Sequence, residues 1–511
     1  MLFNSYEFIF LFLPLALFTY FIFNRISIFI LIFFSLVFYG YSNFLYLYLI
    51  LFTIFFNYFL ARKILLETIP KKKKIFYFGV FINLIILCYY KYTNFFIDNI
   101  NYFFSTNFSN QNILLPLAIS FFTFQQIAFL SDALKNKVGN LSFFKFFVFI
   151  IFFPQLIAGP IVRYNKIVPQ FFKKKSNKFR YANFFLGFGL FVLGLSKKVL
   201  LADNLAPYVD TIFLFSSEGN YISSLDCILS SIAYSLQLYF DFSGYCDMAM
   251  GLAKMFNINL PLNFNSPYKA NNIIDFWRRW HITLTKFLTE FIFLALNLSL
   301  SRKFNSSKFR FINSNSNIVL YFSLGITFFV SGVWHGAGWN FIFWGFLHGG
   351  FLSVNYFWIS IKKSLGLKYL DKSLLYKIFS RTFTFFCVTL SFIFFRAENF
   401  SSAINILSNF LLNFNDILII SNSIIINYEK NLYFTSLLIG ALFIVNITPN
   451  SQELIFSLAP RMNLYKKEIA SYDYTIRKNY KKIILLCIMI SLFYVNLSQL
   501  INIKEYIYFR F

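Results

Sequence analysis

The feature that most limits the fold is a series of long apolar stretches, which occupy residues 6–23, 43–61, 75–90, 182–200, 316–334, 380–395 and 482–500. An α-helix rises about 1.5 Å per residue, so each stretch is long enough to cross the roughly 30 Å hydrocarbon core of a membrane. Backbone groups in lipid must be paired within the segment, which favours helices over barrel strands. The sequence therefore predicts an all-α polytopic membrane protein with roughly a dozen spans.

The charged residues are few and unevenly distributed. They make up 13% of the chain against 58% hydrophobic residues, and the net charge is +26. Basic residues gather in four segments: Lys71–Lys74, Arg163 to Arg180, Lys362 to Arg381 and Arg461 to Lys482. The loops at 92–111 and 201–222 contain no lysine or arginine. Because cytoplasmic loops of membrane proteins are rich in lysine and arginine, this asymmetry indicates topology. No basic and aromatic platform lies outside the spans, so we expect no nucleic-acid partner.

Other features of the chain indicate one continuous membrane domain over residues 1–511. The sequence has no linker, repeat or low-complexity tract. The first basic side chain is Arg25, so the first span is expected to remain in the mature protein rather than to act as a signal peptide. The five cysteines are far apart and lack the spacing of a metal site or a disulfide framework, so we predict no metal.

Two segments do not read as simple spans. Residues 141–162 are apolar but have basic loops on both sides, and Pro154, Gly159 and Pro160 interrupt them. We expect a re-entrant hairpin here, because such a segment should enter and leave on the same face. Residues 241–270 carry Asp241, Asp247 and Lys254 with several asparagines, and we expect irregular backbone there that lines a cavity.

The most promising chemistry surrounds His335, which is one of three histidines. Residues 331–349 read SGVWHGAGWNFIFWGFLHG, so small residues follow His335 while Trp334, Trp339 and Trp344 provide apolar walls. A neutral imidazole in a dry pocket can take a proton from a hydroxyl. Alternatively, His335 is an interfacial residue beside a tryptophan belt. For His348, on an apolar helical stretch, we favour a packing role.

A second cluster, FWRRWHITLTKFL, occupies residues 276–288. At helical spacing Trp277, Trp280 and His281 share one side of a single helix. The functional interpretation directs His281 toward the core and lets Arg278 and Arg279 attract a phosphate-bearing donor. The alternative is an amphipathic helix anchored at the membrane interface by tryptophan and arginine.

Taken together, these segments resemble the bacterial branch of the membrane-bound O-acyltransferase (MBOAT) superfamily, which contains alginate O-acetylases, peptidoglycan O-acetyltransferases and teichoic-acid D-alanyl transferases. The resemblance covers nearly the whole chain. It rests on MLFNSYEFIFLFLP (1–14), FFTFQQIAFLSDALKN (121–136), FFPQLIAGPIVRY (152–164), GLSKKVLLADNLAPYVD (194–210), YFDFSGYCDMAMGLAKMFNINLPLNFNSPYKA (239–270), the two histidine segments and the closing YIYFRF. One departure is FLTEFIFLALNLSLSRKFNSS after the first histidine segment, where relatives have an Arg-Asp-Tyr stretch and an LGG turn.

This resemblance implies a ring of helices around a central tunnel, with His335 as the catalytic histidine and His281 as the second motif histidine. Arg278, Arg279, Trp334 and Trp339 are then the substrate-binding candidates. It also implies a multi-pass protein of the cell inner (cytoplasmic) membrane with no bound cofactor. The donor would be acetyl-CoA or an acyl-carrier thioester, and a periplasmic or membrane-tethered O-acetyltransferase would be the partner.

The final acceptor and the function class leave alternatives. Within the family we favour peptidoglycan O-acetylation, with alginate or another exopolysaccharide as the second choice. A transporter or flippase is the alternative from another class, because Asp241, Asp247 and Lys254 would also suit a permeation path. Against it, the sequence shows no pair of matching broken helices in two halves.

Overall fold

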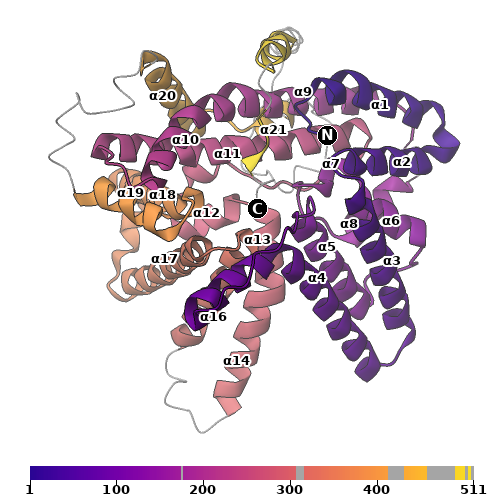
Figure 1. The fold of residues 1–511 in the computed structure, drawn as a ribbon, viewed down its shortest axis with the longest axis horizontal. Coiled ribbons are helices and arrows are strands. Elements are labelled where there is room, and N and C mark those ends of the chain that lie inside the picture. The colour runs from indigo at the N-terminus through magenta and orange to yellow at the C-terminus, as the bar shows by residue number, and fades with distance from the viewer. Residues whose placement is uncertain (174–176, 307–315, 413–430, 457–489, 501–503, 508–511) are drawn as a thin grey trace. The chain divides into compact units, whose positions relative to one another are not determined.

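The computed structural model describes residues 1–511 except 174–176, 307–315, 413–430, 457–489, 501–503 and 508–511 (Figure 1). The described residues contain six helices long and apolar enough to cross a membrane: Leu45–Leu66, Ile69–Phe104, Tyr181–Ser217, Ile282–Lys303, Asn317–His335 and Leu374–Arg396. A seventh candidate is a pair of helices, Glu7–Ile22 and Asn24–Gly40, bent by 102°. These assignments rest on length and composition.

Most of the predicted spans are confirmed. The stretches 43–61, 75–90, 182–200, 316–334 and 380–395 lie within the long helices, and 6–23 forms the first arm of the bent pair. Most of 482–500 lies outside the described residues. The helix Ile282–Lys303 is a candidate span that the sequence analysis did not propose. The count of about a dozen spans, and their arrangement as a ring around a tunnel, stay predictions.

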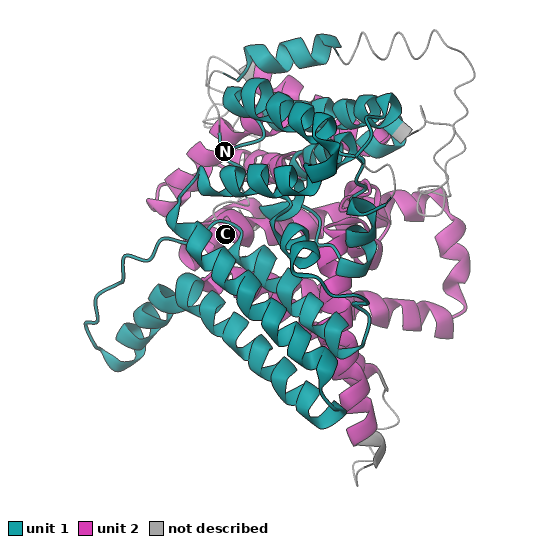
Figure 2. Cartoon of the chain, turned by 90° about the vertical axis from the view of Figure 1, so that its right-hand side faces the viewer, with its two compact units in different colours: residues 1–200, 242–261, 450–510 teal, residues 201–241, 262–449, 511 magenta. Residues whose placement is uncertain are grey.

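The chain divides into two compact units, each assembled from segments that are distant in sequence (Figure 2). Unit 1 comprises residues 1–200, 242–261 and 450–510, and unit 2 comprises 201–241, 262–449 and 511. The single domain expected from the sequence stays a prediction. The helices that begin in unit 1 are α1 (Leu13–Ile22), α2 (Ser27–Gly40), α3 (Leu45–Leu66), α4 (Ile69–Phe104), α5 (Ile119–Leu134), α6 (Phe143–Ile151), α7 (Phe153–Leu156), α8 (Tyr164–Phe171), α9 (Tyr181–Ser196) and α21 (Ser451–Phe456).

The helices that begin in unit 2 are α10 (Asp203–Ser217), α11 (Ser224–Met255), α12 (Ile273–Arg279), α13 (Ile282–Leu288), α14 (Leu294–Ser306), α16 (Ser316–His335), α17 (Trp339–Ser364), α18 (Leu374–Arg396), α19 (Phe400–Leu412) and α20 (Asn431–Ile447). Helix α11 continues past Asp241 into unit 1. The expectation of irregular backbone from residue 241 is therefore wrong as far as Met255, and only the segment after that residue lacks regular helix.

Buried polar side chains join the long helices α3, α4 and α5 of unit 1. Asn57 on α3 donates to the side-chain oxygen of Asn83 on α4 at 3.1 Å, and Asn83 donates back at 2.8 Å. Gln126 on α5 accepts from Asn57 and donates to Thr53 at 3.1 Å. Helices in lipid are not driven together by the hydrophobic effect, so hydrogen bonds between amide side chains of neighbouring helices help to hold them together.

Glycines let α9 and α11 approach closely in unit 1. A Cβ at Gly187 would lie 2.5 Å from the carbonyl oxygen of Gly251, and a Cβ at Gly194 would lie 2.5 Å from that of Gly244. No side chain fits at such separations, so this contact depends on small residues, as in other helix pairs within membranes.

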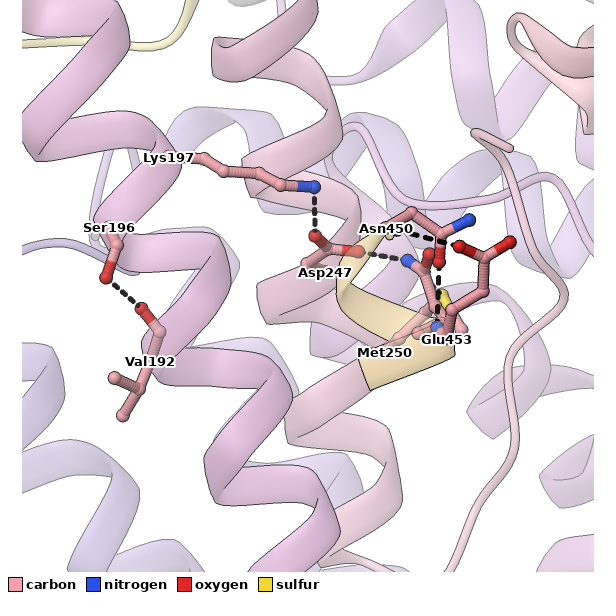
Figure 3. Close-up of polar contacts among 8 residues, drawn as sticks. Val192, Ser196, Lys197, Asp247, Met250, Asn450 and Glu453 are labelled. Atoms are coloured by element: carbon pink, nitrogen blue, oxygen red, sulfur yellow. Dashed lines mark hydrogen bonds and ion pairs between the residues drawn. The ribbon is translucent and has the colours of Figure 1, made fainter. Parts of the chain in front are cut away.

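A buried ion pair joins Lys197, which directly follows α9, to Asp247 on α11 (Figure 3). Lys197 Nζ lies 2.7 Å from Asp247 Oδ2, and the Asp247 side chain is 1% exposed. Gln452 on α21 donates to the other carboxylate oxygen. Asn450 and Glu453 cap the start of α21 reciprocally, each accepting from the other's backbone N–H, at 2.8 and 2.9 Å. Asp247, considered above as part of a permeation path, is thus held in a structural network.

The predicted break within residues 141–162 is confirmed. Helix α6 ends at Ile151, α7 begins at Phe153, and most of the segment is buried. Gln125 and Gln155 donate to the carbonyl oxygen of Phe149, at 3.0 and 2.6 Å, and Phe153 N donates to Ser35 Oγ at 3.2 Å. Entry and exit on the same membrane face stay a prediction.

In unit 2, α16 and α17 form a tightly packed hairpin around Gly336 and Gly338. A Cβ at Gly332 would overlap the carbonyl oxygen of Phe341, and one at Gly345 would overlap that of Phe328. A Cβ at Gly349 would lie 3.2 Å from Gly325 Cα. Gly345 and Gly349 form a G-x-x-x-G pair, which permits this close approach.

We expect Gly345→Ala to destabilise the hairpin by about 1–3 kcal/mol, because the new methyl group would overlap backbone that cannot rotate away. Gly350→Ala is the matched control, since no atom lies within 4 Å of its Cβ position and alanine favours helix by up to about 1 kcal/mol. Thermal unfolding of the purified protein in detergent measures both. Equal melting temperatures for the two variants would contradict the close contact.

Candidate active site

The helical segment that carries His281 is interrupted at this histidine. The prediction of a single helix over 276–288 is therefore wrong. Helix α12 ends at Arg279 and α13 begins at Ile282. His281 adopts a φ of 42°, which lies in the left-handed region of backbone space. Residues other than glycine and asparagine rarely adopt this conformation. Trp277 therefore lies on α12, whereas Trp280 and His281 lie in the break between the two helices.

The segment around Asn263 and Asn265, which has no regular secondary structure, forms hydrogen bonds with the backbone at the break. Ile282 N donates to Asn263 O at 2.9 Å, and Asn265 N donates to Arg279 O at 2.9 Å. The side-chain oxygen of Asn263 accepts from Thr283 N at 3.1 Å and from Thr283 Oγ1 at 2.9 Å. Asn263 is fully buried, and it anchors both sides of the break.

The side-chain oxygen of Asn263 also determines which ring nitrogen of His281 carries the proton. Asn263 Oδ1 lies 3.2 Å from His281 Nδ1. Because the backbone N–H of Thr283 can only donate, the Asn263 atom that faces it must be the oxygen, and His281 Nδ1 must carry a proton to donate to it. Burial lowers the pKa of His281 to about 3, so the ring is neutral at physiological pH and its lone pair is on Nε2.

His335 is the last residue of α16 and is 3% exposed. Its ring lies among aromatic side chains, with centroid distances of 4.7 Å to Trp334, 5.0 Å to Trp344 and 5.2 Å to Phe395. Trp334 also contacts His281, at 6.2 Å between ring centroids. The structure therefore brings the two predicted catalytic histidines to one tryptophan, and both histidines are almost fully buried.

His348 has a different role. Its Nδ1 accepts from Trp277 Nε1 at 3.3 Å, and its Nε2 lies 2.9 Å from Ser391 Oγ. Ser391 already donates to Val388 O, so His348 must donate from Nε2. Both nitrogens are thus used in joining α12, α17 and α18, which agrees with the predicted packing role.

The four predicted substrate-binding residues have different surroundings. Arg279 binds Asp275 at 2.8 Å and the carbonyl oxygen of Asn265 at 3.4 Å, so it supports the break. Arg278 is exposed. Trp334 lies in the aromatic cluster, whereas Trp339 begins α17 and is 55% exposed.

Sequence reasoning missed Asn263 and Phe395, which complete the surroundings of the two histidines. Asn263 belongs to a motif that was quoted for the resemblance, but only the fold shows that it meets His281. Trp344 was named as a wall, and its position between His335 and His348, with ring centroids at 5.0 and 4.8 Å, supports that description.

Comparison with known proteins identifies the chain's relatives. Residues 118–396 match the sequence pattern of MBOAT, the membrane-bound O-acyltransferase family. Over 440 residues the chain is 40% identical to a peptidoglycan O-acetyltransferase of Helicobacter pylori, with 80% of this chain and 79% of the relative covered. The chain belongs to the membrane-bound O-acyltransferase family. The matched region contains all three histidines and both helices of the hairpin.

Two further relatives belong to the branch that the resemblance indicated. A protein of Azotobacter vinelandii named probable alginate O-acetylase AlgI is 34% identical over 411 residues, which cover 79% of this chain and 76% of the relative. A teichoic acid D-alanyltransferase of Bacillus subtilis is 30% identical over 234 residues, which cover 45% of this chain and 56% of the relative. The protein is thus a multi-pass membrane acyltransferase, as the sequence analysis expected.

The two histidines with assigned hydrogen bonds should show opposite tautomers. We expect His281 to carry its proton on Nδ1 and His348 on Nε2. Nitrogen-15 NMR of histidine-labelled protein in bilayers can measure this, because the chain has only three histidines. Asn263→Ala should change the His281 signals and spare those of His348, while Ser391→Ala should do the reverse. An Nε2–H signal for His281 in the wild type would refute the assignment.

Proposed function

We propose that this membrane acyltransferase moves an acetyl group from a cytoplasmic thioester donor toward a cell-envelope polysaccharide, with His335 as general base. The observation that carries this proposal is the burial of His335 among Trp334, Trp344 and Phe395, next to the tryptophan that contacts His281. A neutral imidazole can accept a proton from a hydroxyl.

In the proposed reaction, His335 removes the proton from an acceptor hydroxyl as its oxygen attacks the thioester carbonyl carbon. The resulting tetrahedral intermediate collapses, the carbon–sulfur bond breaks, and the thiol leaves with the proton returned by His335. The products are an acetyl ester and a free thiol, so atoms and charges balance. Positioned general-base catalysis contributes about 10²–10⁴-fold.

The tautomer of His281 limits the role of this second histidine. A neutral ring whose Nδ1–H is donated to Asn263 has an acceptor, and no donor, at Nε2. Such a ring cannot donate a hydrogen bond to a developing oxyanion, but it can accept one from an N–H or O–H group. We therefore assign His281 to orienting a substrate.

For the acceptor we favour peptidoglycan, on the basis of the 40% identity to the peptidoglycan O-acetyltransferase of Helicobacter pylori. Alginate or another exopolysaccharide is the alternative, because alginate O-acetylases are 31–34% identical to this chain. We place the enzyme in the cell inner membrane, with acetyl-CoA or an acyl-carrier thioester as donor. A periplasmic or membrane-tethered O-acetyltransferase would receive the acetyl group and modify the polymer.

We expect His335→Ala to lower acetyl transfer by about 10²-fold or more, because the acceptor hydroxyl loses its base. Acetate released by mild base from sacculi of a deletion strain carrying each variant measures the transfer. The control is His348→Gln, which should lose stability through its hydrogen bonds to Trp277 and Ser391 but keep most of the transfer. Wild-type transfer by folded His335→Ala would exclude the base role. Unchanged sacculi in the deletion strain would favour an exopolysaccharide instead.

We also expect Arg278→Ala to raise the KM for acetyl-CoA by about tenfold while leaving kcat unchanged, because a charged contact to phosphate would be lost. A short acetyl thioester without phosphate is the control donor, and its KM should not change. Arg279→Gln is the matched variant, expected to lower stability because Arg279 binds Asp275 and Asn265 O. An equal rise in KM for both donors would show that Arg278 does not bind phosphate.

A further inference from the structure

Unit 2 contains a large groove between α17 and α18 that the proposed reaction does not use. Its volume is about 970 Å³, at the upper end for ligand sites in proteins. The walls come from α17 between Phe351 and Lys363 and from α18 between Tyr376 and Cys387. The short helix Leu367–Lys372 closes one end.

The lysines of the groove lie at one end, and the rest of its lining is mostly apolar, with polar side chains at Asn271, Asn272, Asn355, Ser380 and Thr384. Lys362 and Lys363 end α17, Lys377 begins α18, and Lys368 lies on the connection, so four lysines gather at this end. Toward the other end the walls are Phe351, Val354, Phe383 and Cys387. From residue 363 to residue 351 the helix rises about 18 Å, close to the depth of one leaflet of the hydrocarbon core.

The charge at the polar end is only partly balanced within the protein. Lys362 binds Asp371 at 2.5 Å and lies over the Tyr376 ring, so this lysine and the aspartate neutralise each other. Among the described residues, Lys363, Lys368 and Lys377 have no ion-pair partner within 4 Å. Three positive charges therefore remain for an anion.

The apolar walls are exposed at the surface of a candidate membrane span. Helix α18 is a candidate membrane span, and its groove residues Phe379 and Phe383 are 67% and 55% exposed. Trp358 on the opposite wall donates to Tyr376 OH at 2.9 Å, and tryptophan and tyrosine typically mark the level of the lipid headgroups. The lysine end thus has the tryptophan and tyrosine that are typical of the headgroup region. The other end has the exposed apolar side chains that are typical of the hydrocarbon region.

We propose that this groove binds an anionic phospholipid of the cytoplasmic leaflet. The headgroup phosphate lies at Lys363, Lys368 and Lys377, and an acyl chain lies along Val354 and Phe383. Basic pockets beside membrane helices bind anionic headgroups in this way, and the segment from Lys362 to Arg381 is one of those that the charge asymmetry assigns to the cytoplasm. A soluble phosphate would leave the apolar walls without a partner. This proposal stands independently of the acetyl-transfer mechanism.

The test titrates the full-length protein, purified in uncharged detergent, with phosphatidylglycerol or with phosphatidylcholine of the same acyl chains. Native mass spectrometry counts the bound lipid, and thermal unfolding measures stabilisation. We expect phosphatidylglycerol to bind and raise the melting temperature, and phosphatidylcholine to do neither. The triple variant Lys363→Gln, Lys368→Gln, Lys377→Gln should bind phosphatidylglycerol about 10²-fold more weakly. The control variant Lys71→Gln, Lys73→Gln, Lys74→Gln removes equal charge from residues that do not line the groove and should bind as the wild type does.

A second variant tests the apolar part of the groove. Val354 is 67% exposed, so Val354→Trp should fold normally, fill the groove and abolish phosphatidylglycerol binding while acetyl transfer continues. The proposal would be overturned by equal stabilisation by phosphatidylcholine, by full stabilisation by glycerol 3-phosphate alone, or by equal loss of binding in the control variant. Displacement of phosphatidylglycerol by acetyl-CoA would also overturn it and assign the groove to the donor.

Discussion

A helix that breaks inside a membrane protein must find new partners for each backbone group that the break releases, because an unpaired buried group costs several kcal/mol. Both breaks described above meet this requirement, the first with amide and hydroxyl side chains and the second with backbone groups and the side chain of Asn263. Between α6 and α7, Gln125 and Gln155 satisfy Phe149 O, and Ser35 satisfies Phe153 N. Between α12 and α13, the segment around Asn263 supplies the partners. The second break is also where His281 is held, so the hydrogen bonds that stabilise the fold there also set the chemistry of the histidine.

The sequence was sufficient to predict most spans, because length and hydropathy alone determine whether a segment can cross lipid. It was not sufficient to predict the break at His281. Trp277, Trp280 and His281 follow helical spacing, and apolar periodicity indicates which side of a segment is buried without showing that the helix is continuous. The partner that makes the break possible, Asn263, lies 18 residues earlier in the chain, and a pairing of this kind depends on the tertiary fold. The sequence analysis also did not identify the candidate span Ile282–Lys303, which begins directly after the break and continues through a π-helical turn into α14.

The motifs that carried the family resemblance have two physical functions. In unit 1 they hold the fold together. Asp132 and Arg163, from two of the quoted motifs, form an ion pair at 3.1 Å, and Lys197 and Asp247 join two others. The opening and closing motifs meet at Tyr245, whose ring lies 5.0 Å from both Phe3 and Tyr506. In unit 2, by contrast, the quoted histidines lie together with Trp334 and Trp344. A motif on its own does not show which function it has; the contacts of its side chains do.

Helix α17 connects the two sites of unit 2. Near its start, the close contact at Gly345 places Trp344 against His335, and one turn later His348 is tied to α12 and α18. Its last turns carry the lysines of the groove. A ligand that holds α17 against α18 at the lysine end restrains the same helix whose other end positions the aromatic wall of His335. Since α17 is continuous from Trp339 to Ser364, the groove and the aromatic wall of His335 are built on one helix.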